Sequence, residues 1–273
     1  MRYDPYEYRA SRRSVVMAPR GMVATSQPLA AQAGIDILKA GGNAIDAAIA
    51  VNAVLGVVEP MSCGIGGDLF AIVSEAGSDR LTGLNASGRA PHGASIAYYR
   101  DRGHEYIPGS GPLSWSVPGC VDGWNCLLDR FGTMSLGQVL EPAIWYAENG
   151  FPVSDIIARD WTGTTLLLSP WPESARVYLP GGKATEPGAV FRNPDLGRSY
   201  RILAEGGRDA FYHGEIAEAI VACSQDVGGL FSLEDFRDHA STWDDPVCAE
   251  YRGHTVWELP PSGQGIAALQ MLN

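Results

Sequence analysis

Residues 40–73 read AGGNAIDAAIAVNAVLGVVEPMSCGIGGDLFAIV and contain the strongest structural signals of the chain. Gly41-Gly42 can end a preceding helix, because glycine adopts the left-handed conformation after a helix without steric cost. Asn43 can cap the next helix, which we predict over residues 44–58. Nearly every side of that helix is apolar, so we expect it to be buried, with its alanines, Ala48 among them, packed closely against a neighbour.

A glycine-rich turn, residues 64–67, follows this helix and leads into a continuous apolar strand over residues 69–73. The turn at 76–79 returns the chain as an antiparallel partner over residues 80–85. Both faces of these strands are apolar, so we expect the sheet to be covered on both sides. The turn is not a dinucleotide-binding fingerprint, because it precedes a strand and follows a helix.

Apolar spacing and turn residues predict the remaining elements on either side of this stretch. The other expected helices cover residues 29–40, 118–131, 136–149, 196–205 and 213–225. The other expected strands cover residues 22–25, 114–117, 247–251 and 255–259, the last two as a hairpin. We expect Ser26 to cap the first of these helices.

The composition restricts the classes of function. Of the 273 residues, 45% are hydrophobic and 19% are charged, which is typical of a globular protein and not of a disordered one. The net charge of −11 makes nucleic acid and anionic membrane unfavourable partners. No stretch of 18 apolar residues is present, so no membrane span is predicted.

Cysteine and histidine usage indicates a cytoplasmic protein without a metal site. The number of cysteines, five, is odd, and their spacing contains no C-x-x-C pair. We therefore expect reduced thiols in a reducing compartment and assign a cytoplasmic location. The five histidines show no metal-binding spacing, and we expect them to be scattered over the surface.

The segment Asn85-Ala86-Ser87-Gly88-Arg89-Ala90-Pro91 directly follows the second strand, at a sheet edge where binding groups are often placed. A guanidinium at such a place can receive a carboxylate through two parallel hydrogen bonds. The alternative is an arginine that only stabilises the loop. Arg89, with Ser87 and Asn85 beside it, forms our set of candidate substrate-binding residues.

Ten short motifs resemble, in chain order, those of the gamma-glutamyltransferase (glutathione hydrolase) family. They are Gln27-Pro28-Leu29-Ala30, residues 40–48, Glu59-Pro60, Gly64-Ile65-Gly66-Gly67-Asp68, Arg89-Ala90-Pro91, Ser116-Val117-Pro118-Gly119, Phe131-Gly132-Thr133-Met134, Glu141-Pro142-Ala143, Tyr251-Arg252-Gly253 and Pro260-Pro261-Ser262-Gly263. The resemblance extends over the chain from about residue 20 onward and is highly specific.

The resemblance implies an α/β fold, the αββα four-layer sandwich of N-terminal-nucleophile (Ntn) hydrolases, which this chain contains incompletely. It implies one domain over residues 1–273, the large-subunit part, with residues 1–20 as an N-terminal extension. The family is made as a precursor that cuts itself and frees a threonine nucleophile at the start of the small subunit. The α-amino group of that threonine acts as the base, and the acyl-enzyme passes to water or to an acceptor amine.

The expected function is therefore glutathione hydrolysis or gamma-glutamyl transfer, with no cofactor and no metal. The expected partners are a small-molecule amide substrate and the small subunit of the same precursor, and the sequence is also compatible with a homo-oligomer. No threonine of this chain matches the family nucleophile, which we expect downstream of Asn273. The chain alone is expected to be inactive.

One position departs from the family pattern. The family's arginine for the substrate carboxylate lies three residues before the Ala-Pro pair, a position that Ser87 holds here. Arg89 stands immediately before that pair instead. Two other functions therefore stay open: a small-acid amidase of the same superfamily, acting for example on an oxamate-like substrate, and a non-catalytic binding protein of the same fold.

Overall fold

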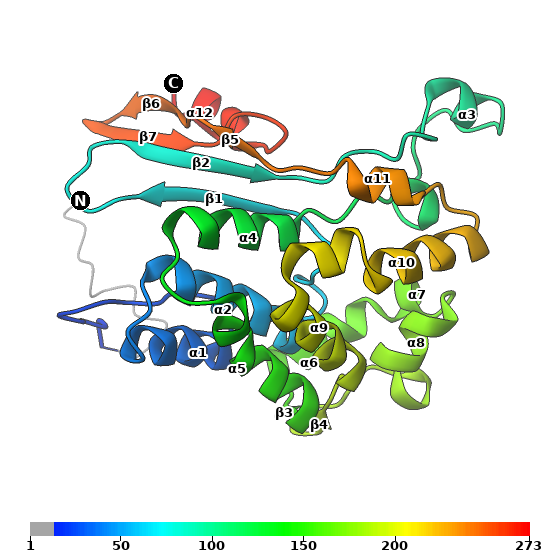
Figure 1. Cartoon of the computed structure of the whole chain (residues 1–273), viewed down its shortest axis with the longest axis horizontal. Helices are drawn as coiled ribbons and strands as arrows, with labels where there is room; N and C mark the ends of the chain where they lie inside the picture. The colour runs from blue at the N-terminus through cyan, green and yellow to red at the C-terminus, as the bar shows by residue number, and fades with distance from the viewer. Residues whose placement is uncertain (1–13) are drawn as a thin grey trace, which may run out of the picture.

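The computed structural model describes residues 14–273 (Figure 1). Residues 1–13, the larger part of the predicted N-terminal extension, lie outside the described residues. Residues 14–20 are exposed and belong to no helix or strand.

Helices make up most of the described structure. The six longer ones are α1 (Pro28–Lys39), α2 (Ala44–Val58), α4 (Cys120–Phe131), α5 (Leu136–Asn149), α9 (Pro194–Tyr212) and α10 (Glu215–Asp226). The shorter ones are α3 (Ile96–Arg100), α6 (Asp155–Gly163), α7 (Thr165–Leu168), α8 (Pro172–Tyr178), α11 (Leu233–Arg237) and α12 (Gly265–Leu272), with 3₁₀ turns at Pro112–Ser114 and Pro180–Gly182.

Three strands, β1 (Leu69–Ser74), β2 (Leu81–Ala86) and β5 (Thr242–Asp244), form an antiparallel sheet in the order β1-β2-β5. Two further antiparallel pairs are β3 (Phe151–Pro152) with β4 (Val190–Phe191) and β6 (Val247–Tyr251) with β7 (His254–Glu258). Figure 1 shows the six longer helices below the three-stranded sheet, with α4 directly beneath β1, and the β6–β7 hairpin with α12 above it.

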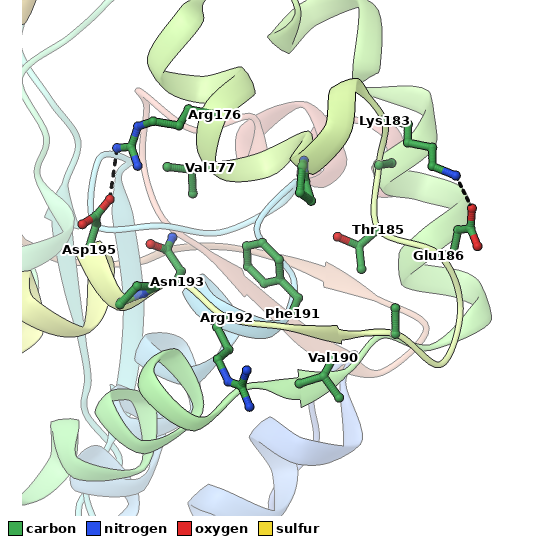
Figure 2. Close-up of a pocket in the computed structure, with 14 residues that line it drawn as sticks. Arg176, Val177, Lys183, Thr185, Glu186, Val190, Phe191, Arg192, Asn193 and Asp195 are labelled. Carbon is green, nitrogen blue, oxygen red and sulfur yellow. Dashed lines mark hydrogen bonds and ion pairs between the residues drawn. The ribbon is translucent and has the colours of Figure 1, made fainter.

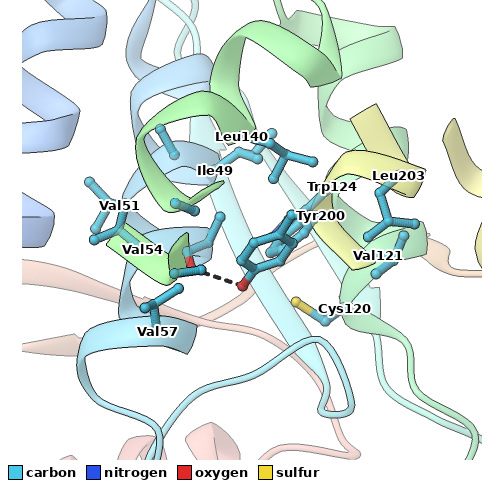
Figure 3. Close-up of a cluster of buried hydrophobic side chains, with 14 of the residues drawn as sticks. Ile49, Val51, Val54, Val57, Cys120, Val121, Trp124, Leu140, Tyr200 and Leu203 are labelled. Carbon is cyan, nitrogen blue, oxygen red and sulfur yellow. Dashed lines mark hydrogen bonds between the residues drawn. The ribbon is translucent and has the colours of Figure 1, made fainter. Parts of the chain in front are cut away.

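Helix α2 is the centre of the core, as its composition predicts. It packs against both α1 and α5. Tyr200 of α9 is fully buried against it and donates a hydrogen bond from its hydroxyl to the carbonyl of Ala53 at 2.9 Å (Figure 3). Trp124 of α4 donates from its indole nitrogen to the side chain of Asn52, also at 2.9 Å. The polar atoms of these two buried rings therefore both have a hydrogen-bond partner.

The buried face of α2 includes Ala47, Ala50 and Ala53, but Ala48 is exposed. The expectation that Ala48 packs against a neighbour is therefore wrong, because its side chain lies on the face of α2 that points away from the core.

We expect Ala50→Leu to lower the free energy of unfolding by about 1–3 kcal/mol through overpacking. Ala48→Leu is the matched control and should unfold within about 0.5 kcal/mol of the wild type in the same urea titration. Equal stability of the two variants would contradict this packing.

A buried carboxylate joins the beginning of α2 to the beginning of α5. Asp46 forms a capping box with Asn43 and accepts hydrogen bonds from the Thr133 hydroxyl at 2.5 Å and the Met134 amide at 3.1 Å. Burial alone would raise the pKa of Asp46, but these hydrogen bonds outweigh burial and hold it below its ordinary value. Two of the motifs quoted above, residues 40–48 and residues 131–134, therefore act as one structural unit.

Two predicted strands are absent from residues 14–273. Residues 22–25 alternate in exposure but have no strand partner. Residues 114–117 are a 3₁₀ turn followed by an extended segment, because Pro118 has no amide hydrogen with which to continue a ladder.

Helices α1, α4 and α10 begin or end one or two residues from the predicted bounds, and two further differences concern a cap and a helix break. Gln27, not Ser26, caps α1, and its side chain accepts from the amide of Leu29 at 2.5 Å. Helix α9 continues to Tyr212, past the predicted end at residue 205. A break at Gly207, whose φ of 61° favours glycine, separates its two parts.

One face of β1 is uncovered in the described chain. Phe70 and Ile72 are 44% and 40% exposed, whereas Val73, which points to the opposite face, is buried. The expectation of a sheet covered on both sides is therefore wrong for β1. The expectation holds better for β2, because Leu259 covers the strand at Gly83. A Cβ added to Gly83 would lie 2.5 Å from the Cδ2 atom of Leu259.

Candidate functional site

Three loops meet at the end of β2, where the sequence places the candidate residues. The Gly67 carbonyl, in the glycine turn before β1, accepts from the amides of Gly119 at 3.0 Å and Cys120 at 2.9 Å. The Asp68 carboxylate accepts from the Gly88 amide at 2.8 Å. The turn before β1 thus binds both the loop after β2 and the beginning of α4.

Backbone contacts in this junction leave no room for side chains. A Cβ on Gly88 would lie 1.9 Å from the Val117 carbonyl oxygen, and one on Gly119 would lie 2.0 Å from the Ala86 carbonyl oxygen. The Val117 amide donates to the Arg89 carbonyl at 3.0 Å. We call residues 117–119 the strap, because they cross the loop after β2 and hold it.

The three predicted binding residues have different positions in this junction. Asn85 and Ser87 shape the loop: the Asn85 side chain accepts from the Ser87 amide at 3.0 Å, and the Ser87 hydroxyl donates to Asp68 at 3.3 Å. Arg89 is exposed, and its guanidinium makes no hydrogen bond or ion pair with any other residue between 14 and 273. Its backbone is held by the strap while its side chain is free. A fixed backbone with a free guanidinium is suited to binding a planar anion.

A second charged cluster lies directly beneath the strap. Asp122, in the first turn of α4, forms a short ion pair with Arg208 and accepts from the Ser241 amide at 2.6 Å and hydroxyl at 2.5 Å. Burial alone would raise the pKa of Asp122, but the hydrogen bonds from Ser241 and Arg208 outweigh burial and keep it below its ordinary value. The cluster fixes the beginning of α4 to α9 and to the segment before β5.

His239 completes this cluster and was not expected there. Its side chain is fully buried, so the prediction of histidines scattered over the surface is wrong for this residue. Its ring stacks on Tyr212, with 5.2 Å between centroids and 14° between planes. Neither ring nitrogen has a hydrogen-bond partner among residues 14–273. Sequence spacing could not find this residue, because its neighbours come from three distant parts of the chain.

The burial of His239 predicts a pH dependence of stability. Burial lowers the pKa of the imidazole, and the nearby Arg208 and Arg89 also lower it, against the opposing effect of Asp122 and Asp68. As pH falls below about 6.5, the unfolded chain therefore takes up a proton that the folded ring does not. This contribution to stability is complete above that pH and is lost as the pH falls.

We expect the free energy of unfolding of the wild type, relative to His239→Phe, to decrease between pH 7 and pH 5. Urea unfolding across this range measures the difference, since the phenylalanine variant lacks the titrating group. Parallel pH profiles for the two proteins would contradict the prediction.

A cavity elsewhere among the described residues is lined by cations that already have partners. It measures about 580 Å³ and lies around Phe191 and Thr185, between α8, the beginning of α9 and β4 (Figure 2). Arg176 at its rim pairs with Asp195 at 3.0 Å, and Lys183 pairs with Glu186 at 2.5 Å. Arg192, which also lines this cavity, donates to the Asn149 carbonyl at 3.0 Å. Because all three cations are already engaged, we place the candidate site at the Arg89 loop.

Within residues 14–273, no group of three or more histidine, cysteine or acidic side chains is placed to hold a metal ion. All five cysteines of the chain are free thiols. None of the helices within that range is long and apolar enough to cross a membrane.

Comparison with known proteins identifies the family. The gamma-glutamyltranspeptidase family model matches residues 30–273. The chain belongs to the gamma-glutamyltranspeptidase family. It is 40% identical over 259 residues to the glutathione hydrolase-like YwrD proenzyme of Bacillus subtilis. The aligned region covers 94% of this chain and 49% of that protein. It spans about half the length of the curated relatives it matches.

Solved gamma-glutamyltranspeptidase relatives confirm the predicted fold class. The cephalosporin acylase from Bacillus halodurans superposes with a TM-score of 0.91 at 43% identity, over 100% of this chain and 52% of that one. The Helicobacter pylori gamma-glutamyltranspeptidase gives 0.87 at 30% identity, over 92% and 73% of the two chains. The α/β architecture is therefore that of the Ntn-hydrolase family to which the motifs point.

Proposed function

We propose that this chain is the large-subunit portion of a self-processing threonine hydrolase that cleaves amides of small carboxylic acids. The observation that carries this proposal is the exposed Arg89 guanidinium, which has no partner among residues 14–273 and extends from a backbone fixed by the strap. Family membership and the proenzyme names of the relatives support the processing. Arg89 would hold the carboxylate of the acyl group, so that the amide carbon faces the nucleophile.

The chemistry proposed for the whole protein is acyl transfer. The α-amino group of the freed threonine accepts the proton of the hydroxyl as its oxygen attacks the amide carbon and a C–O bond forms. The C–N bond then breaks, and the amine leaves with the proton that the α-amino group returns. Water or an acceptor amine then attacks the ester and releases the threonine. The part played by this chain is binding: it orients the substrate carboxylate and so lowers the entropic cost of attack.

The uncovered face of β1 gives the small subunit a place to pack. Phe70 and Ile72 present apolar surface there, and Met271 of α12, near the end of the chain, is 81% exposed. In an Ntn sandwich the second sheet would cover this exposed face of β1. That sheet would belong to the small subunit of the same precursor. The cytoplasmic location and a homo-oligomer stay predictions.

Two acyl groups are candidates for the substrate. A gamma-glutamyl group follows from the family. A smaller acid follows from the replacement of the family arginine by Ser87, which leaves a shorter, uncharged side chain beside Asp68. Similarity to a structure described as a cephalosporin acylase supports an acyl group other than gamma-glutamyl.

The test is to express the full-length precursor, follow self-cleavage by mass spectrometry, and then assay a gamma-glutamyl anilide beside anilides of smaller dicarboxylic acids. We expect two chains, with a threonine at the new amino terminus, and turnover of at least one carboxylate-bearing anilide. A precursor that stays intact, or that cleaves only amides lacking a carboxylate, would contradict the proposal. Normal cleavage without turnover of any amide would favour a non-catalytic binding protein.

A further inference from the structure

The strap has two aromatic rings beneath it. The Tyr212 hydroxyl donates to the Pro118 carbonyl at 2.6 Å and so holds one part of the strap directly. The His239 ring lies parallel to Tyr212 and reaches the next residue: its Cε1 atom is 3.4 Å from the position that a Cβ on Gly119 would occupy. Each ring therefore supports one of two consecutive strap residues.

The strap is hydrogen-bonded directly to the loop that carries Arg89. The strap residue Val117 holds the Arg89 carbonyl through its amide, and Gly119 holds the turn at Gly67. The strap and the loop after β2 also touch without intervening side chains, at Gly88 and at Gly119. A displacement of the strap would therefore move the backbone from which the Arg89 side chain extends.

We propose that His239 is a positioning residue for the carboxylate site, whose ring supports the strap from beneath and so fixes Arg89. This inference rests on the proposed function, in which Arg89 binds the substrate carboxylate. Packing, not hydrogen bonding, provides the support, because neither imidazole nitrogen has a hydrogen-bond partner among residues 14–273 and the ring is held by stacking on Tyr212. The nearby Asp122 carboxylate lies 3.8 Å from Nε2, beyond hydrogen-bond distance. A displacement of about 1 Å at a binding group can cost up to about a hundredfold in rate.

Three variants of the full-length precursor separate this role from a purely structural one. His239→Ala removes the ring, and we expect KM for the best carboxylate-bearing anilide to rise at least tenfold. His239→Phe retains a stacked ring and removes two unpaired buried nitrogens, so it should restore KM to within about twofold of the wild type and unfold at an equal or higher temperature. Leu140→Ala, in the core of α5 away from the strap, is the control for lost stability.

The outcomes are distinct. A tenfold rise in KM in His239→Ala alone supports the proposal, whereas Leu140→Ala should lose stability with KM unchanged. Equal KM values in His239→Ala and the wild type would overturn the positioning role, and so would a phenylalanine variant that behaves like the alanine one. If His239→Ala does not mature, His239→Asn carries the same expectation. A wild-type precursor that turns over no carboxylate-bearing amide refutes the proposed function instead, and the positioning role with it.

Discussion

Replacing Arg89 by lysine should raise KM for the carboxylate-bearing substrate at least about tenfold, equivalent to 1.4 kcal/mol, while self-cleavage stays normal. Lysine keeps the charge but lacks the two parallel donors that match a carboxylate. Full removal of such a pair is expected to cost about 2–4 kcal/mol of binding, so Arg89→Ala should be more severe. Steady-state kinetics on the matured protein, with mass spectrometry of the two subunits, measures both effects.

The free guanidinium makes this expectation specific. Arg89 has no ion pair or hydrogen bond among residues 14–273 that its loss could break, so a purely structural role predicts no change in KM. Arg201 is the matched control, because it is also exposed but forms a two-bond pair with Glu148 on the helical surface. We expect Arg201→Lys to leave KM unchanged. An unchanged KM in Arg89→Lys would remove Arg89 from the site.

Moving the arginine tests which acyl group the site accepts. In the double variant Ser87→Arg with Arg89→Ala, the guanidinium occupies the position that the family pattern assigns to it. If the position of this cation determines specificity, the ratio of kcat/KM for a gamma-glutamyl anilide over that for a smaller acid should rise relative to the wild type. The Ser87 hydroxyl also bonds to Asp68, so Ser87→Ala alone is the necessary control for the lost contact.

Local signals predicted the elements that depend on residues close in sequence. Helix α2 is found at the predicted bounds, because Asn43 caps it and Asp46 completes the capping box. The β1–β2 pair is confirmed for the same reason: the strands are adjacent along the chain, and a short turn sets their register. The loop carrying Arg89 could be located because it directly follows β2.

Long-range pairing could not be predicted in this way. Strand β5 has only three residues, and it becomes a strand because Trp243 lies opposite Leu84, more than 150 positions earlier in the chain. The cluster beneath the strap has the same origin, since Asp122, Arg208 and His239 come from three separate segments. A carboxylate in the first turn of a helix is ordinary in sequence, and only tertiary contact distinguishes Asp122 from Asp129, farther along the same helix.

That cluster gives the largest stability effect we expect. Asp122→Ala should lower the free energy of unfolding by about 3–5 kcal/mol, because it leaves the partly buried Arg208 guanidinium without its carboxylate partner. The Ser241 amide and hydroxyl lose their acceptor at the same time. We expect little soluble precursor and little self-cleavage, since the strap precedes α4 directly and depends on the position of that helix.

An exposed ion pair is the control that separates the effect of burial on stability from the effect of losing a charge. Glu148 forms two hydrogen bonds with Arg201, at 2.6 and 2.7 Å, but both side chains are substantially exposed. Glu148→Ala should therefore lower the free energy of unfolding far less than Asp122→Ala does, despite the good geometry of the pair. Urea unfolding of both variants, with Asp122→Asn as the shape-preserving intermediate, gives the comparison. If Asp122→Ala unfolds at the same urea concentration as Glu148→Ala, the buried cluster does not hold α4, and the strap would be held from beneath by the rings of Tyr212 and His239 without help from the ion pair.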